Sequence, residues 1–227
     1  MKRKNKRRKS FIPQILLLMG LAVFSFVCIN NLREEFKETL AGSHSELPDE
    51  WYLILVNYKH PIPESYVPEL TVLDNGRSVD SRIYPALQQM FDDMREEGIY
   101  PVVGEGYRTA AEQQHMMDEK VEAYINDGFP RKRAEAFAEN EVAAVGKSEH
   151  QLGLAVDINA DKSLSDNEDV YNWLARNAYK YGFILRYPFD KTSITGIDFE
   201  PWHYRYVGEE AAKEIYDRGI CLEEYLE

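Results

Sequence analysis

Residues 148–158 read Ser-Glu-His-Gln-Leu-Gly-Leu-Ala-Val-Asp-Ile, and the alternation of their side chains decides the fold of this chain. Successive side chains of a β-strand point to opposite faces of a sheet. One set of alternate positions is entirely apolar and can enter a core: Leu152, Leu154, Val156 and Ile158. The other set holds two small residues and one acid: Gly153, Ala155 and Asp157. The stretch therefore predicts a strand that is buried on one face and carries a carboxylate on the other.

His150 has the wrong parity for this strand. It lies an odd number of residues before Asp157, so a regular strand would send the two side chains to opposite faces. Glycine adopts backbone conformations that other residues avoid, and a bend at Gly153 would bring the ring of His150 to the side of Asp157. Taken alone, each of these two side chains is an ordinary polar residue.

A second segment, Glu200-Pro201-Trp202-His203, supplies another imidazole and another carboxylate. Positions three apart on a regular strand face opposite sides, so Pro201 must interrupt the strand if Glu200 and His203 are to reach one centre. A catalytic zinc ion usually has three protein ligands and one water, and a nearby glutamate can accept the proton of that water. Two imidazoles, one carboxylate and one further acid therefore indicate a hydrolytic zinc site.

The remaining elements are short and follow one another irregularly. Strands are expected at 51–57, 100–103, 183–186 and 202–207, and helices at 80–97, 109–126, from 130 onward, at 168–180 and at 209–217. Thr109 and Glu112 form a capping box, and Gly104-Glu105-Gly106 predicts a tight turn that places Arg108 at a strand-to-helix junction. Because the order has no βαβ rhythm, we expect a single α+β domain with a small antiparallel sheet flanked by helices.

The N-terminal segment differs in composition from everything that follows. Residues 1–10 hold seven Lys and Arg, and residues 11–29 form an apolar run that would span roughly 28 Å as a helix, close to the thickness of a bilayer core. We expect a cytoplasmic tail at 1–10, a transmembrane anchor at 11–29, a stalk at 30–48 and an extracellular catalytic domain at 49–227. A cleaved signal peptide is the weaker reading, because no small-x-small cleavage site follows the apolar run.

The charge excludes one class of partner. The formal net charge is −12, and residues 1–30 contribute +7, so the rest of the chain carries −19. Such an acidic body offers no basic surface for nucleic acid. Of the two cysteines, Cys28 lies in the apolar run, which leaves Cys221 without a partner for an intradomain disulfide.

Three motifs together carry a family resemblance. They are Ser148-Glu149-His150-Gln151-x-Gly153-x-Ala155-x-Asp157, Glu200-Pro201-Trp202-His203-x-Arg205-Tyr206-Val207-Gly208, and Tyr107-Arg108-Thr109. From about residue 51 to residue 208 the chain resembles the VanY-type D-alanyl-D-alanine carboxypeptidases, zinc peptidases of bacterial cell-wall metabolism in the lysostaphin, D-Ala-D-Ala and hedgehog fold group. The resemblance implies one Zn²⁺ bound by His150, Asp157 and His203, and Glu200 as the general base.

The same resemblance implies further roles near the metal. Arg108 would contact the substrate or the developing oxyanion, and Ser148 and Gln113 would hydrogen-bond peptide groups near the scissile bond. One departure lies at 145–147, where Val-Gly-Lys replaces the Pro-Gly-Thr lead-in that relatives often carry. It alters a loop and leaves every predicted ligand in place.

Three functions are compatible with these motifs. The first is a zinc carboxypeptidase that removes the terminal D-alanine from peptidoglycan stem peptides. The second is an L,D-carboxypeptidase that acts on tetrapeptide stems, because relatives with either specificity share the motifs. The third is an inactive zinc-containing wall-binding module. Glu200 argues against the third, because a structural zinc needs no base and usually has a fourth protein ligand.

Overall fold

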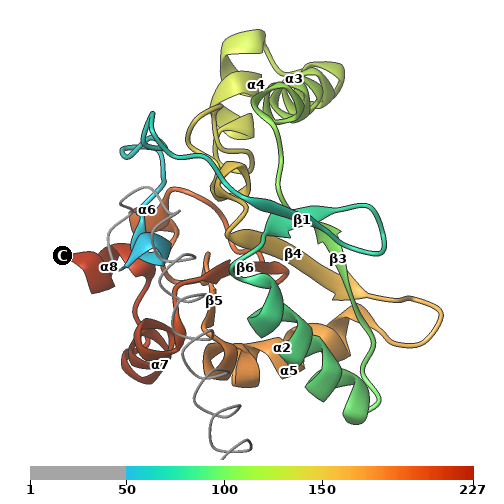
Figure 1. Cartoon of the computed structure of the whole chain (residues 1–227). Helices are drawn as coiled ribbons and strands as arrows, with labels where there is room; N and C mark the ends of the chain where they lie inside the picture. The colour runs from blue at the N-terminus through green and yellow to red at the C-terminus, as the bar shows by residue number, and fades with distance from the viewer. Residues whose placement is uncertain (1–49) are drawn as a thin grey trace, which may run out of the picture. The chain divides into compact units, whose positions relative to one another are not determined.

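The centre of the molecule is a four-stranded antiparallel sheet in the order β3-β4-β6-β5 (Figure 1). The computed structural model describes residues 50–227. The sheet strands are β3 (Pro101–Glu105), β4 (Ala155–Ala160), β6 (His203–Tyr206) and β5 (Phe183–Leu185). A separate hairpin joins β1 (Leu70–Val72) and β2 (Ser78–Asp80). The α+β class and the small antiparallel sheet are therefore as predicted.

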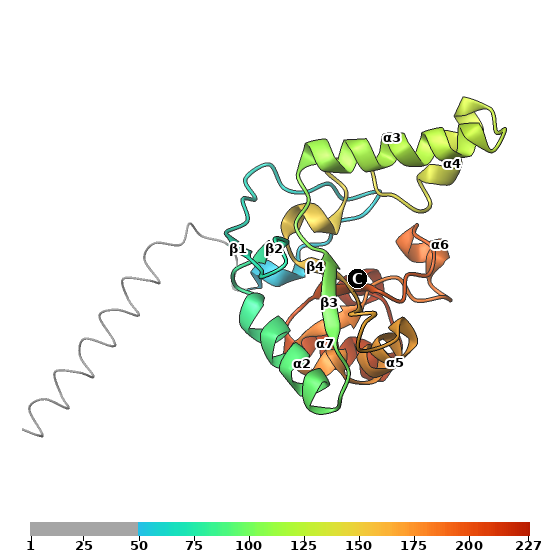
Figure 2. The same ribbon diagram turned by 90° about the vertical axis from the view of Figure 1, so that its right-hand side faces the viewer.

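Three helices pack against strands of this sheet, and two others stand apart from it on the opposite side. On one side lie α2 (Tyr84–Glu96), α5 (Asn167–Asn177) and α7 (Glu209–Arg218), and on the other lie α3 (Ala110–Asn126) and α4 (Arg131–Ala138) (Figures 1 and 2). The short helices are η1 (Trp51–Leu53), η2 (Glu149–Leu152), η3 (Ala178–Tyr181), α6 (Thr192–Thr195) and α8 (Leu222–Leu226). The α3 and α4 helices pack on each other through a small cluster of their own around Val121, Ala134 and Ala138.

The strand predicted from residues 148–158 forms as β4, although it begins later than expected. Its apolar set is completely buried: Leu152, Leu154, Val156 and Ile158 are each 0% exposed. The other face of β4 carries Asp157, which is opposite His203 in the antiparallel pairing with β6. Burial of one face against the helices therefore fixes which side of the sheet the site residues occupy.

Two predicted helices form for the expected reasons. In α2, Leu87, Met90 and Met94 are buried along one face, as the spacing of three and four requires. The N-terminus of α3 has the predicted capping box, in which the Thr109 side chain accepts from the Glu112 amide and the Glu112 carboxylate accepts from the Thr109 amide. These local signals were sufficient because they need no distant partner.

Other expectations were wrong. The strand expected at 51–57 is absent, and η1 forms there instead, because Arg205 Nη2 donates to the carbonyls of Tyr52 and Ile54, both at 2.8 Å. Where the turn was expected at 104–106, Gly104 and Glu105 continue β3, with a register shift between Val103 and Glu105, and Gly106 follows the end of the strand. The β1–β2 hairpin, α6 and α8 were not predicted, because their short sequences have little periodicity.

A buried ionic cluster joins the two ends of the domain to the sheet. We define it as Glu149, Arg186, Arg205 and Glu223. Glu149 Oε1 accepts from Arg186 Nε and Arg205 Nη1, both at 2.8 Å. Arg186 also donates to both Glu223 oxygens, at 2.9 and 2.7 Å, and Asn57 Nδ2 donates to Glu223 at 3.0 Å. The cluster thus connects η2, the end of β5, β6, α8 and the chain near residue 57.

The expected tail, anchor and stalk at 1–10, 11–29 and 30–48 lie outside the described residues. Within residues 50–227, no helix is both long and apolar enough to cross a bilayer. Cys221 is a buried free thiol in this part of the chain.

The ionic cluster predicts how stability depends on pH. Burial would raise the pKa of Glu149, but Arg186 and Arg205 hold it well below the ordinary value of 4.5. Burial would likewise raise the pKa of Glu223, but its pairing with Arg186 lowers that pKa below the ordinary value. A carboxyl with a lowered folded-state pKa adds stability above its unfolded pKa and loses it as the pH falls toward the folded value. We expect the Tm measured by circular dichroism to fall steeply below about pH 5.

The substitution Glu223→Gln should lower the free energy of unfolding at pH 7 by about 3 kcal/mol, because it leaves Arg186 without one of its buried counterions. It should also flatten the loss of Tm between about pH 5 and pH 3. Glu139→Gln, at an exposed glutamate, is the matched control and should change neither quantity. If the Tm of Glu223→Gln fell with decreasing pH as steeply as the Tm of the parent, this account of the ionic cluster would be contradicted.

Candidate active site

The sheet itself places two of the predicted metal ligands side by side. Asp157 lies in the middle of β4 and His203 is the first residue of β6, and the two are direct partners in the strand register. His203 Nδ1 lies 3.1 Å from Asp157 Oδ1. Antiparallel pairing therefore brings together residues that are distant in the sequence.

The third ligand comes from η2 and not from the strand. Gly153 ends η2 in the left-handed conformation (φ +72°), which is the bend that the sequence required. His150 Nε2 consequently lies 3.4 Å from Asp157 Oδ1. The other ring nitrogen, Nδ1, is 2.8 Å from the carbonyl oxygen of Gly106, which can only accept a hydrogen bond. This contact leaves Nε2 as the nitrogen with a free lone pair.

Gly106 is held in a position that no other residue could occupy. A Cβ at this residue would lie 2.2 Å from the carbonyl oxygen of Ser78 on β2. Tyr107 donates its backbone N–H to that same carbonyl at 2.6 Å. The β1–β2 hairpin thus fixes the Gly106 carbonyl, which in turn orients the His150 ring.

The three side chains fit a metal ion. Their ligand atoms all lie within 4.8 Å of one another. Asp157 Oδ1 is buried and has no hydrogen-bond partner among residues 50–227, although two ring nitrogens approach it. A buried polar atom without a partner is costly, and a cation would satisfy it. Two imidazole nitrogens and one carboxylate oxygen are the donors of a catalytic zinc site.

Glu200 lies beside the triad but is not a member of it. The chain at Pro201 is irregular, so Glu200 and His203 face one centre, and Glu200 Oε2 is 3.5 Å from His203 Nδ1. Burial raises the pKa of Glu200 to about 7, while His203 opposes the rise and Asp157 adds to it. A carboxylate with a pKa near neutrality is suited to accept and return a proton.

Arg108 reaches the same site from the start of α3. Its side chain is 6% exposed, and Nη1 donates to Gln113 Oε1 at 2.8 Å. Gln113 Nε2 in turn donates to the carbonyl of Ala143 at 2.6 Å, so the amide is held from both ends. Arg108 Nε is buried and has no partner in the described part of the chain. A fixed cation with an unused donor is suited to a carboxylate or an oxyanion.

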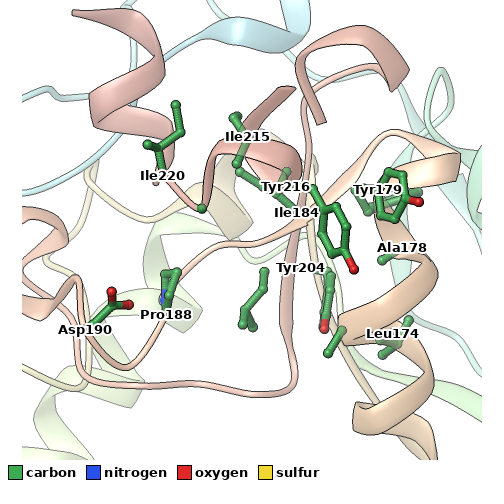
Figure 3. A pocket seen from close by; sticks show the side chains of 14 residues that line it. Leu174, Ala178, Tyr179, Ile184, Pro188, Asp190, Tyr204, Ile215, Tyr216 and Ile220 are labelled. Atoms are coloured by element: carbon green, nitrogen blue, oxygen red, sulfur yellow. The ribbon is translucent and has the colours of Figure 1, made fainter. Parts of the chain in front are cut away.

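All seven predicted site residues line one cavity of about 180 Å³: Arg108, Gln113, Ser148, His150, Asp157, Glu200 and His203. Ser148 is buried at 4% exposure and immediately precedes η2. A larger cavity of about 310 Å³ lies between α5, β5 and α7, and Figure 3 shows Tyr179 and Tyr216 on one side of it and Asp190 on another. That cavity contains no histidine, so it has no comparable set of ligands.

Sequence reasoning missed residues that surround the metal ligands. The ring of Tyr187 packs against that of His203, with the two ring centroids 4.8 Å apart, and Tyr187 lines the cavity. The buried partners Glu149, Arg186 and Arg205 were also missed as a group. The sequence does contain a signal that these arginines are buried. Arg186 directly follows the apolar run 183–185, and Arg205 lies between two aromatic residues. Arginine is seldom fully buried without a paired acid.

The VanY family model, D-alanyl-D-alanine carboxypeptidase, matches residues 76–209, which include every predicted site residue. The chain belongs to this family. A D-alanyl-D-alanine carboxypeptidase of Enterococcus faecalis (strain ATCC 700802 / V583) is 58% identical over 177 residues, which are 78% of this chain and 66% of that protein. The chain thus spans slightly less than two thirds of the length of that relative.

Solved structures of two specificities are similar to this VanY-family chain. A mutant of the vancomycin resistance D,D-pentapeptidase VanY from a VanB-type resistance cassette, in complex with Zn(II), has a TM-score of 0.77 at 58% identity and covers 78% of this chain and 100% of its own. The LdcB LD-carboxypeptidase has a TM-score of 0.64 at 38% identity, covering 76% of this chain and 84% of its own. The predicted family is confirmed.

The triad makes a direct prediction about metal content. His150→Ala removes one of three ligands, so zinc measured by elemental analysis should fall from roughly one ion per chain to near zero. His115→Ala is the matched control, because His115 has a side-chain exposure of 75% and lies outside the cavity. Full retention of zinc by His150→Ala would contradict the assignment of this ligand.

Proposed function

We propose that this protein is a zinc-dependent D-alanyl-D-alanine carboxypeptidase that removes the terminal D-alanine from peptidoglycan stem peptides. The observation that carries the proposal is a half-buried glutamate, Glu200, whose carboxylate lies beside a three-residue metal triad and lines the same cavity. Three ligands leave a coordination position for water or substrate, and the extra acid supplies a base. A purely structural metal site needs neither feature.

The residues divide the reaction among them. When bound at the triad, zinc would supply a Lewis acid for the scissile carbonyl and lower the pKa of a water to about 7. Glu200 would accept the proton of the attacking water and pass it to the departing amine of D-alanine. Its carboxylate lines the same cavity as the triad and lies beside His203, so it is placed to carry a proton in both directions.

Arg108 would bind the negative charge of the substrate. Its side chain is nearly buried, and a hydrogen bond to Gln113 holds the guanidinium near the N-terminus of α3. In a water-poor cavity, a fixed cation stabilises a terminal carboxylate or a tetrahedral oxyanion more strongly than it would in water. Ser148 and Gln113 lie in the same cavity, where they could hydrogen-bond the peptide on either side of the scissile bond.

D,D-specificity is favoured over L,D-specificity by similarity. The chain is 58% identical to the D,D-pentapeptidase structure and 38% identical to the LdcB LD-carboxypeptidase. A second structure of the former type, VanYB in complex with D-alanine-D-alanine, is also 58% identical with a TM-score of 0.77. We therefore place the pentapeptide, which ends in two D-alanines, first among the substrates.

Purified protein incubated with pentapeptide and tetrapeptide muropeptides should remove one alanine from the pentapeptide, as read by mass spectrometry. The tetrapeptide should be a poor substrate. Preferential cleavage of the tetrapeptide would replace the proposal by an L,D-carboxypeptidase. Cleavage of cross-linked dimers alone would indicate an endopeptidase and contradict both.

Glu200→Gln should retain zinc yet lose turnover by about 10²–10⁴-fold, because the amide has a similar shape but cannot accept the proton. Zinc content and kcat are measured on the same preparation. Glu139→Gln, at an exposed glutamate, should leave both unchanged. Hydrolysis by Glu200→Gln at the rate of the parent would exclude Glu200 as the base, and loss of zinc would show that it acts as a ligand.

We further propose that residues 11–29 anchor the enzyme in the cell membrane, with the catalytic domain outside. The support is the sequence: seven basic residues in 1–10 precede an apolar run of bilayer length. The full chain should fractionate with membranes and resist extraction by high salt, whereas a chain starting at residue 49 should be soluble. Release of the full chain by salt alone would contradict an integral anchor.

A further inference from the structure

Two buried polar atoms next to the triad face each other without a hydrogen bond. Glu149 Oε2 and His203 Nε2 are both buried, and neither has a hydrogen-bond partner among residues 50–227. They lie 3.7 Å apart. A charge-assisted N–H to carboxylate bond is typically about 2.7–2.9 Å long, so a shift of about 1 Å would satisfy both atoms. Buried polar atoms are rarely left unpaired, which makes this pairing significant.

The position of Glu149 Oε2 is set by the other oxygen of the same carboxylate. Oε1 accepts from Arg186 and from Arg205, both at 2.8 Å. All three side chains are fully buried or nearly so, at 1%, 0% and 0% exposure. With Oε1 held by two guanidinium groups, the carboxylate cannot rotate, and Oε2 remains directed at His203.

The two nitrogens of His203 have separate surroundings. Nδ1 faces the triad, 3.1 Å from Asp157 Oδ1 and 3.5 Å from Glu200 Oε2, while Nε2 faces Glu149. A neutral imidazole has one N–H donor and one acceptor nitrogen, and only the acceptor can bind a metal. Nδ1 can therefore serve as a ligand only when the proton is on Nε2. In that tautomer, a carboxylate oxygen of Glu149 is in position to accept a hydrogen bond from the Nε2–H group.

We propose that Glu149 is a positioning residue that holds His203 in the tautomer whose Nδ1 binds the metal, and that Arg186 and Arg205 hold Glu149 in place. The inference rests on the zinc site of the proposed function. His150 obeys the same rule with a different partner, because its Nδ1 contacts the Gly106 carbonyl and its Nε2 faces the triad. Acceptors that fix the tautomer of a ligand histidine increase its affinity for the metal.

A purely structural role for Glu149 is the competing explanation. Its carboxylate also neutralises two buried arginines, so any substitution will lower stability. The two roles predict different results for the amide Glu149→Gln. The arginines can donate only to the amide oxygen, so the amide N–H₂ group is turned toward His203 Nε2. That nitrogen would then have to accept, which moves the ring proton to Nδ1 and blocks the metal.

The decisive experiment compares Glu149→Gln with Glu223→Gln. Glu223 belongs to the same ionic cluster and pairs with Arg186, but it lies outside the cavity of the triad. Zinc affinity is measured on the folded proteins by competition with a chromophoric chelator. We expect Glu149→Gln to lose about 10–100-fold in affinity and Glu223→Gln to stay near the parent, although both lower the Tm. Equal affinity in Glu149→Gln and the parent would overturn the proposal and leave the zinc site intact.

A measurement on the parent protein keeps the test independent of folding of the variants. Long-range ¹H–¹⁵N spectra of the zinc-loaded protein report which ring nitrogen of each histidine carries the proton. We expect His203 to carry it on Nε2 and His150 to carry it on Nδ1. A proton on His203 Nδ1 would refute the positioning role. Failure of the parent to bind zinc at all would instead refute the proposed function.

Discussion

The pairing of one buried carboxylate with two buried arginines is the constraint on which the rest of the structure depends. Glu149 lies in η2, Arg186 follows β5 and Arg205 lies in β6, so the pairing is possible only when the sheet and η2 have docked. An unpaired buried charge costs several kcal/mol, so partly assembled states are strongly disfavoured. The guanidinium of Arg205 also donates hydrogen bonds to the backbone carbonyls of Tyr52 and Ile54. These bonds hold the start of the domain against the sheet.

The surroundings of Asp157 and Glu200, which line the same small cavity, shift the pKa values of these two carboxyl groups in opposite directions. Burial would raise the pKa of Asp157, but His150 and His203 hold it well below its ordinary value, so it is an anion and a suitable ligand. Burial raises the pKa of Glu200 to about 7, and the nearby Asp157 adds to the rise while His203 and Arg108 oppose it. Environments that separate the pKa values of neighbouring acids are how one site obtains both a permanent anion and a proton carrier.

The sequence was most informative where the signal was local. The alternation in 152–158, the capping box at Thr109 and the spacing in α2 each depend on neighbours within a few residues, and each formed as predicted. The bend at Gly153 was also predictable, because only a change of face could bring His150 to Asp157. The strand expected at 51–57 was wrong because its backbone carbonyls bind Arg205, a residue about 150 positions away.

By itself, the sequence predicted the candidate ligands and the candidate base, through the motifs it shares with the VanY family, and the α+β class, through short-range periodicity. Tertiary structure alone decided which ring nitrogen of each histidine faces the triad. It also decided that Glu149 is directed at His203 and that Glu200 is buried enough to have a pKa near 7. Those properties are set by desolvation and by contacts between β4, β6, η2 and α8, which are far apart in the chain and meet only when the sheet has formed.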